Sequence, residues 1–221
     1  MIMGVLFLAV LALPAFADDL GDSRQLVSKA TMTFENFTKA PEMDALRSLL
    51  KDAKGIFIAP QILKGAFVVG AAGGTGVFVA YDSKTGHWAG PAFYTIGEGS
   101  LGFQIGAEAS ELVLLAMTDR GVNALLNSSA KLGADAGVAA GPIGMGAAAS
   151  TANLSADIIS FSRSKGLFAG ISVDGAVVAV RDGLNNAFYG KANLSPRDIL
   201  IKRTVTSEHS MGLIKEIARA A

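Results

Sequence analysis

The sequence contains no cysteine and only two histidines among its 221 residues. The absence of cysteine excludes disulfides, thiolate metal ligands, thiol nucleophiles and lipid attached to a cysteine. His87 and His209 lie far apart in the chain, and neither a histidine pair at metal-binding spacing nor a D-x-D-x-D calcium pattern is present. We therefore expect no metal site and no cofactor.

The sequence also lacks net charge, because 19 lysines and arginines balance 19 aspartates and glutamates. A neutral molecule has no long-range field that draws it toward nucleic acid, so we expect no nucleic-acid partner. Beyond residues 1–17, glycines and charged residues interrupt every apolar segment before it is long enough to span a bilayer as a helix. Any basic contact must therefore come from a local group of side chains.

Motifs of catalytic chemistry are missing as well. The glycines of residues 70–76 do not match G-x-G-x-x-G, and strand-like sequence follows them where a nucleotide motif needs a helix. A G-x-S-x-G elbow is absent, since Glu98 stands where a glycine would have to precede Ser100. Three carboxylates, Glu98, Glu108 and Glu111, flank apolar strands, and solvated strand ends are the interpretation we favour. We predict that the protein is not an enzyme.

Residues 1–17 form an apolar run that ends in Ala15-Phe16-Ala17, the small-x-small pattern that precedes a signal-peptidase site. We predict cleavage before Asp18 and export to the periplasm or cell envelope. The run carries no lysine or arginine, and its alternative interpretation is an uncleaved anchor, for which it is short and interrupted by Pro14. Residues 18–221 then form a single domain, with a core at about 23–201 and a C-terminal helix at about 207–220.

The stretch from Lys64 to Gly106 sets glycine against β-branched and aromatic residues. Glycine inside a strand marks a bulge, a bend or a close backbone approach, so this stretch predicts a strongly curved antiparallel sheet or a partly closed barrel. Asp82–Gly86 has the composition of a hairpin turn into a strand from Trp88, and Asp174-Gly175 that of a two-residue hairpin turn. Other expected strands are Ile56–Ala59 ending at Pro60, Leu101–Ala107, Glu111–Thr118, Ala156–Ser162, Gly166–Val173 and Ala176–Val180.

Amphipathic helices are expected on both sides of this sheet, which makes the fold class α+β. Apolar residues recur at three- and four-residue spacing in Ser23–Phe37. The other expected helices follow Pro41, span Asp119–Leu126, begin at Ser195 and run from about Ser207. Residues 131–151 are small and uncharged rather than hydrophilic, so a close-packed strand or loop is favoured over disorder.

Binding is the function that these exclusions leave. Lys54, Lys64, Arg163 and Lys165 stand at the edges of apolar strands, where they could contact phosphate headgroups. Solubility at strand ends is the commoner explanation for such residues. Packing onto the sheet is likewise the commoner role for a helix like Ser23–Phe37, although a hinged helix could alternate between the sheet and a membrane.

Many short segments, in order along the chain, resemble the SYLF domain of bacterial exported proteins and of eukaryotic membrane-trafficking and actin-patch proteins. The resemblance covers about Ser23 to Ile201. The segments that carry it are Ala53–Ile56 (AKGI), Lys64–Gly70 (KGAFVVG), Gly74–Val77 (GTGV), Trp88–Pro91 (WAGP), Gly102–Glu108 (GFQIGAE), Ala140–Pro142 (AGP), Ser160–Gly170 (SFSRSKGLFAG) and Phe188–Gly190 (FYG).

The resemblance implies a lipid-binding module, because eukaryotic members bind phosphoinositides, partly through an N-terminal amphipathic helix, and some bundle actin. In this chain the helix is less basic than a phosphoinositide sensor should be, and the lipobox cysteine of many bacterial members is absent. An exported protein would ordinarily meet neither actin nor phosphoinositides, so we expect membrane lipid, in particular anionic phospholipid, and no actin binding. The candidate lipid-binding residues are Leu26, Lys29, Phe34, Phe37, Lys64, Trp88, Arg163 and Lys165.

A second hypothesis comes from a different class of protein. Exposed edges of a sheet can be extended by an added strand, so the chain could bind a protein partner or a second copy of itself through its edges. This structural or assembly role predicts a stable oligomer in the absence of lipid.

Overall fold

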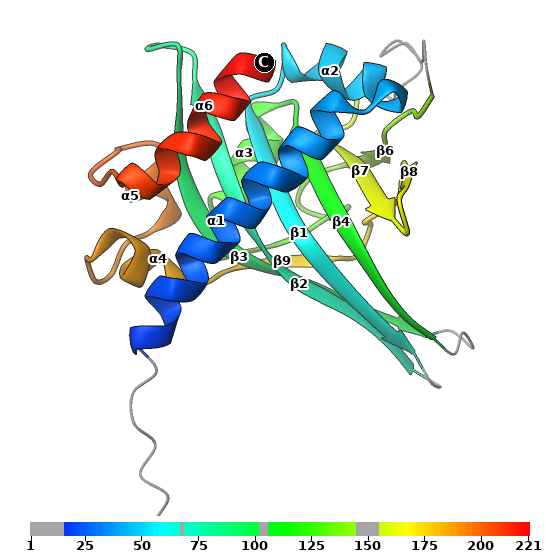
Figure 1. Ribbon diagram of the computed structural model, residues 1–221, viewed down its shortest axis with the longest axis horizontal. Helices are drawn as coiled ribbons and strands as arrows, with labels where there is room; N and C mark the ends of the chain where they lie inside the picture. The colour runs from blue at the N-terminus through cyan, green and yellow to red at the C-terminus, as the bar shows by residue number, and fades with distance from the viewer. Residues whose placement is uncertain (1–15, 67–68, 102–105, 145–154) are drawn as a thin grey trace, which may run out of the picture.

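The computed structural model describes residues 16–66, 69–101, 106–144 and 155–221 (Figure 1). Most of the expected signal peptide lies outside these residues, and Phe16 is the first residue of the first helix. In chain order the helices and strands are α1 (Phe16–Lys39), η1 (Pro41–Met43), α2 (Asp44–Leu50), β1 (Gly55–Ala66), β2 (Val69–Asp82), β3 (His87–Leu101), β4 (Gly106–Ala116), α3 (Asp119–Leu125), β5 (Ser129–Lys131), β6 (Val138–Ala140), β7 (Ile158–Ser164), β8 (Leu167–Ala169), β9 (Val177–Val180), α4 (Asp182–Tyr189), α5 (Pro196–Leu200), η3 (Glu208–Ser210) and α6 (Met211–Ala220).

The described strands form one curled sheet in the order β5-β9-β3-β2-β1-β4-β7-β6, with β8 paired to β7. Its centre is built from the long strands β1 to β4, and neighbouring strands there are antiparallel. Figure 1 shows these strands bending away from α1 toward one end of the molecule, so that the sheet is a half-barrel with helices at both chain ends. The expected α+β class and strong curvature are confirmed.

A bulge in β1 lets the sheet bend. The pairing of β1 shifts register between Ile58 and Gln61 against β2, and between Ala59 and Ile62 against β4, so a bulge spans Pro60. The expectation that Pro60 ends the strand is therefore wrong. Proline cannot donate to a ladder, but a bulge removes the need for that donor and allows the strand to continue.

The core lies on both faces of the sheet. On the convex face, α1, α2, α4 and α6 cover apolar side chains such as Val77 and Val113 (Figure 1). On the concave face, Phe57, Phe78 and Tyr94 pack together under α3 and α5. Because both faces of the central strands are covered, these strands read as nearly continuous apolar sequence, and β4 occupies the interior position expected from that sequence.

Three expectations for the C-terminal half need correction. β8 pairs with β7, whereas β9 pairs with β3 and β5, so Asp174-Gly175 turns the chain without making a hairpin of its flanking strands. The helix α4 is not among the helices expected from the sequence. β6 pairs with β7 in parallel, which departs from an all-antiparallel sheet.

Other local predictions are confirmed by the structure. The helix α5 begins with a capping box in which Ser195 and Asp198 satisfy each other's backbone donors. The helix expected over Asp119–Leu126 is also present, as α3. Its N-terminal cap is Thr118 rather than Asp119, since the Thr118 hydroxyl accepts from the Gly121 amide. The expected strand Leu101–Ala107 divides between β3 and β4, and residues 102–105 lie outside the described part of the chain.

Candidate functional site

A groove of about 470 Å³ lies on the convex side between α1, β4 and the turn from β7 to β8; we call it the α1 groove. Lys29 and Met32 border it from α1, Glu111 from β4, and Arg163 and Lys165 from β7 and its turn. These residues are distant in sequence, and the packing of α1 across the sheet brings them together.

The arginine of the α1 groove is already paired. Arg163 Nε lies 2.6 Å from Glu111 Oε2, and the Thr33 hydroxyl donates to Glu111 Oε1 at 3.0 Å. The Arg163 guanidinium also lies 5.8 Å from the centre of the Phe168 ring, which in turn meets Phe37 edge to face at 5.1 Å. Arg163 therefore fastens β7 to β4 and α1, and little of its charge is available to a ligand.

The two lysines of the groove differ from Arg163. Among the described residues, neither Lys29 nor Lys165 forms an ion pair, and Lys29 donates only to Gln25 Oε1 at 3.1 Å. Both side chains are exposed. Their ammonium groups can therefore meet an anion without first breaking an ion pair.

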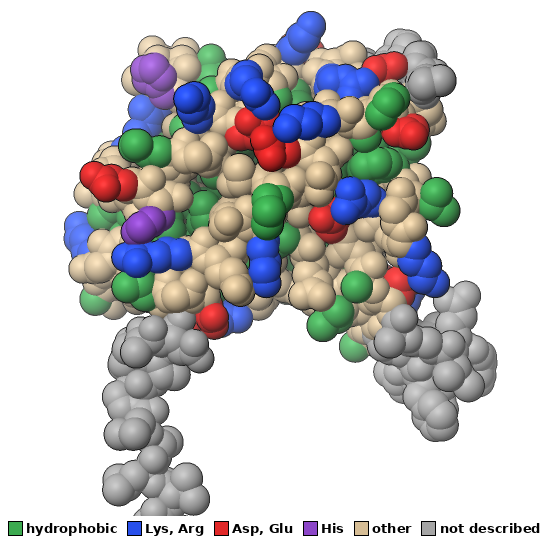
Figure 2. All heavy atoms as spheres, viewed as in Figure 1, with side chains coloured by type: hydrophobic (Ala, Val, Ile, Leu, Met, Phe, Trp, Pro, Cys, Tyr) green, Lys and Arg blue, Asp and Glu red, His purple; other side chains and the backbone are tan. Residues whose placement is uncertain are grey.

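Large apolar side chains reach the surface beside these lysines. Met32 is 54% exposed on α1. Leu167, 76% exposed, pairs with Ser164 and alternates with Phe168, which packs on Phe37 of α1, so Leu167 lies on the opposite face of the sheet from the groove. Leu63 of β1 is 58% exposed and pairs in register with Ala109, which lines the groove. Figure 2 shows basic and acidic side chains interspersed over the face of α1, with hydrophobic side chains emerging toward the lower right. The α1 groove thus combines unpaired cations with exposed apolar groups.

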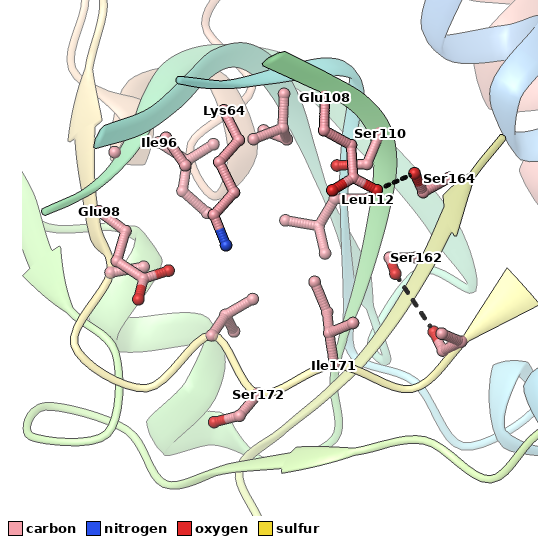
Figure 3. Close-up of a pocket in the computed structure, with 16 residues that line it drawn as sticks. Lys64, Ile96, Glu98, Glu108, Ser110, Leu112, Ser162, Ser164, Ile171 and Ser172 are labelled. Carbon is pink, nitrogen blue, oxygen red and sulfur yellow. Dashed lines mark hydrogen bonds between the residues drawn. The ribbon is translucent and has the colours of Figure 1, made fainter. Parts of the chain in front are cut away.

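A second hollow, of about 410 Å³, lies on the other side of the sheet; we call it the concave cavity (Figure 3). Strands β1 to β4 and β7 form its floor, and its opposite wall is formed by Ala169 at the end of β8 and by residues 171–173 and 176 after it. Lys64, Glu98 and Glu108 are exposed at its mouth, whereas Ile96 and Leu112 are buried inside it. Ser110 lines both hollows, so they are neighbours across one strand.

The charged groups at this mouth form one row across the sheet. Lys64 pairs in register with Ala72 of β2 on one side and with Glu108 of β4 on the other, and Ala72 pairs with Glu98 of β3. Figure 3 shows the Lys64 side chain directed into the space between the two glutamates. The Ser164 hydroxyl donates to Glu108 Oε1.

The structure separates the residues proposed from the sequence into three groups. Lys29, Arg163 and Lys165 meet at the α1 groove, and Lys64 belongs to the concave cavity. Trp88 lines neither hollow, because it packs in the core beside the Tyr81 ring, 5.2 Å away.

The apolar members of the proposed set face inward. Phe34 and Phe37 are fully buried between α1 and the sheet, and Leu26 packs partly buried against the same core. In this conformation the two phenylalanines cannot touch a bilayer, because they lie on the face of α1 that the sheet covers. The structure shows α1 in the packed arrangement that the sequence favoured over insertion.

Sequence reasoning missed Met32, Leu63 and the pairing of Glu111. Met32 lies on the exposed face of α1 and so falls outside the apolar stripe that periodicity identifies. Leu63 precedes Lys64, and an apolar residue beside a basic residue near a strand end is the signal that could have found it. The Arg163–Glu111 pair joins two strands that pair in register at these residues, which local sequence cannot reveal.

The described part of the chain was considered for two other kinds of site, a metal centre and a membrane-spanning helix. No group of three or more His, Cys, Asp or Glu side chains in that part of the chain could hold a metal ion. Within the same part, none of the helices combines the length and the hydrophobicity needed to cross a bilayer.

The fold and these hollows define an α+β domain with a curled glycine-rich sheet and charged groups at the rims of two concavities. A family model described as "Ysc84: Las17-binding protein actin regulator" matches residues 97–220. The chain belongs to this family, the Ysc84 or SYLF-domain family, as its sequence motifs indicated.

Curated relatives agree with this assignment. Protein YSC84 of Saccharomyces cerevisiae is 35% identical over 147 residues, which cover 64% of this chain and 31% of that protein. SH3 domain-containing YSC84-like protein 1 of Homo sapiens is 33% identical over 168 residues, covering 73% of this chain and 48% of that protein. LAS seventeen-binding protein 3 of Saccharomyces cerevisiae is 36% identical over 146 residues, covering 64% and 31%. The chain thus spans less than half the length of these relatives.

Proposed function

We propose that this domain is a non-enzymatic protein that binds anionic phospholipid at a membrane surface through the α1 groove and its rim. The observation that carries the proposal is the meeting of Lys29, Lys165 and exposed Met32 around one groove, with exposed Leu63 on the same face of the sheet beside Ala109. The expected signal peptide supports a place of action after export, in the periplasm or cell envelope.

The chemistry of this rim matches the interface of a bilayer. Lysine side chains near an anionic surface contribute about 1 kcal/mol each, and the attraction fades over a Debye length of about 8 Å at physiological salt. Exposed leucine and methionine side chains can enter the acyl boundary, where each buried apolar group adds to the affinity. Two lysines and two large apolar residues therefore support reversible, peripheral binding.

This proposal keeps α1 packed on the sheet. Releasing the helix would expose Phe34 and Phe37, at a cost of about 1.5–3 kcal/mol for each side chain removed from the core. The surface that α1 already presents needs no such release. The names of the family and its relatives refer to binding of Las17 and to regulation of actin, but the lysine and apolar rim favours a lipid surface for this chain.

Flotation with liposomes tests the proposal. Residues 18–221 should float with vesicles that contain anionic phospholipid, less so at high salt, and weakly with purely zwitterionic vesicles. A Leu63→Asp variant should lose most of this flotation, because it places a carboxylate where an apolar contact is proposed. A Lys29→Glu, Lys165→Glu variant should lose it as well.

The matched control is Met211→Asp, which changes a comparably exposed apolar residue on α6 that does not line the α1 groove (Figure 1). This variant should float like the unmodified protein. Unchanged flotation of Leu63→Asp, or an equal loss in Met211→Asp, would remove the α1 groove from the account. Absence of flotation for the unmodified protein would refute the proposed function itself.

A further inference from the structure

The concave cavity exists because the side chains on one face of the sheet change in size along the strands. At one end Phe57 and Phe78 each meet Tyr94 edge to face, with ring centres 6.3 Å apart, and fill the space. Toward the other end, the same face carries Ala72 and Ser110. Small residues at these positions leave a hollow where aromatic residues would have filled the half-barrel.

Gly74 of β2 brings the backbones of β1 and β2 close together between the filled end and the hollow end of this face. It lies between Ala72 and Phe78 in the alternation of β2, and a methyl group at Gly74 would meet the Gln61 carbonyl oxygen at 2.1 Å. β2 therefore cannot present a side chain there without moving β1. The space beside Gly74 is filled by β1, and the cavity lies beyond it, where Ala72 lines it.

The wall opposite the sheet is held in place by hydrogen bonds. Ser160 of β7 donates to the carbonyl oxygens of Ile171 and Ala139. The Leu132 amide donates to the Ala176 carbonyl at 2.8 Å, and the Gly175 amide to the Leu132 carbonyl at 2.9 Å. Because both ends of this wall are fastened, the cavity is pre-formed, as ligand sites usually are.

The inside and the mouth of the cavity differ in chemistry. The inner lining includes the buried residues Ile96, Leu112, Val173 and Ala176. The mouth carries one ammonium group, from Lys64, and two carboxylates, from Glu98 and Glu108. Within the described residues Lys64 makes no ion pair with either glutamate, although Glu108 is its direct partner across the strands. An apolar interior with both signs of charge at its entrance fits an amphiphile with a zwitterionic headgroup.

We propose that the concave cavity binds one acyl chain of a phospholipid whose headgroup carries a phosphate and a primary amine. The chain lies against Ile96, Leu112 and Val173, the phosphate meets Lys64, and the ammonium group meets Glu98 or Glu108. A volume of about 410 Å³ suits a single chain, since it falls at the lower end of small-molecule sites. A headgroup with negative charge alone is disfavoured, because two carboxylates face one lysine.

This ligand differs in site and in charge from the anionic surface proposed for the α1 groove, and the two can be tested separately. The probe is a monoacyl phosphoethanolamine with an oleoyl chain, kept below its micelle concentration and titrated by calorimetry without any bilayer. We expect saturable binding of one lipid per protein. A monoacyl phosphoglycerol should bind at least about tenfold more weakly, and glycerophosphoethanolamine, which has no chain, should not bind measurably.

Filling the cavity provides the structural test. Ala72→Phe adds a ring inside the cavity, and phenylalanine is well suited to a strand. This change should weaken binding of the monoacyl phosphoethanolamine at least about tenfold. Ala71→Phe is the matched control, because neighbouring side chains of a strand point to opposite faces and Ala71 does not line the cavity. It should bind the lipid like the unmodified protein.

A second variant settles the case in which Ala72→Phe does not fold. Lys64→Gln changes an exposed side chain, and it should fold normally but lose the greater part of the affinity for the phosphate-bearing probe. The inference is overturned if the unmodified protein shows no saturable binding below the micelle concentration, or if the probe binds folded Ala72→Phe or Lys64→Gln as tightly as the unmodified protein. A Leu63→Asp variant that no longer floats should still bind the monoacyl lipid, which separates failure of this inference from failure of membrane docking.

Discussion

At Gly74 the absence of a side chain is a steric requirement, whereas at the adjacent Gly73 it is not. A methyl group on Gly74 would lie 2.1 Å from the Gln61 carbonyl oxygen, in the bulged part of β1. A methyl group on Gly73 would lie 3.5 Å from the Ile96 carbonyl oxygen, an ordinary contact distance. The close approach of β1 to β2 therefore requires glycine at position 74, whereas position 73 has room for alanine.

We expect Gly74→Ala to lower the free energy of unfolding by about 1–3 kcal/mol, since β1 must shift to make room. Gly73→Ala should be neutral or stabilising by up to about 1 kcal/mol, because alanine reduces the entropy of the unfolded chain. Urea unfolding followed by circular dichroism gives both values. Equal effects of the two substitutions would contradict the close approach of β1 and β2.

Asp157 is a residue whose charge should contribute to stability. The Thr118 hydroxyl donates to its Oδ1 at 2.5 Å, the Gly137 amide donates to its Oδ2 at 2.9 Å, and Arg120 Nε lies 3.7 Å from Oδ2. These contacts, the Thr118 hydrogen bond foremost, outweigh partial burial and hold the pKa of the Asp157 carboxyl below its usual value. The carboxylate links the start of α3 to the strand that follows residue 157.

Because the pKa of Asp157 is lower in the folded than in the unfolded chain, its charge stabilises the fold fully above the unfolded pKa of about 3.9. This contribution is lost as the pH falls through the folded-state pKa. Asp157→Asn should therefore be less stable than the unmodified protein by about 1–2 kcal/mol at pH 6, because one hydrogen bond is lost. The difference should shrink at pH 3, and urea unfolding at the two pH values measures it. A difference that stays constant or grows on acidification would contradict the assigned role.

At the scale of elements, α1 should remain packed on the sheet while the protein binds lipid. The Thr33–Glu111 hydrogen bond marks a place where α1 and β4 are close, and the chain has no native cysteine to interfere. A Thr33→Cys, Glu111→Cys variant, joined by a short thiol-reactive cross-linker, should float with anionic vesicles as well as its uncrosslinked form. Loss of flotation on cross-linking would show that α1 has to leave the sheet.

Local signals were sufficient to predict most elements. Each of these signals comes from residues that are close together in sequence, and each expected element is present. The examples are the amphipathic helix of residues 23–37, the capping box of Ser195 and Asp198, and the turn at Asp82–Gly86. Pro60 was misjudged because the bulge that accommodates it depends on the register of β1 against β2 and β4. The partners of β8 and β9 depend on distant strands and could not be read from the turn between them.

The site was less predictable than the fold, since it is assembled from distant segments. Basic strand ends identified Lys64 and Lys165 as candidates, but only the packing of α1 shows that Lys165 shares a groove with Lys29. Glu98 and Glu108 are exposed near strand ends, as the sequence indicated, but only the sheet register shows that they lie in one row with Lys64. Registers and helix positions are long-range properties, which periodicity within a segment does not encode.

At the scale of the whole molecule, the edges of the sheet argue against assembly by strand addition. The strands at the two ends of the sheet order, β5 and β6, are each only three residues long. Short edge strands offer few unpaired backbone groups to another chain. Residues 18–221 should therefore be a monomer in multi-angle light scattering without lipid. A stable oligomer would instead favour the assembly hypothesis.

The depth at which the rim of the α1 groove enters a bilayer tests the central claim most directly. Single-cysteine variants at Met32, Leu63 and Met211 would each carry a polarity-sensitive fluorophore, because the chain contains no other cysteine. On addition of anionic vesicles, the emission at positions 32 and 63 should shift to shorter wavelength, while that at position 211 stays unchanged. Bound protein with no shift at position 63, or with an equal shift at position 211, would contradict docking through the α1 groove.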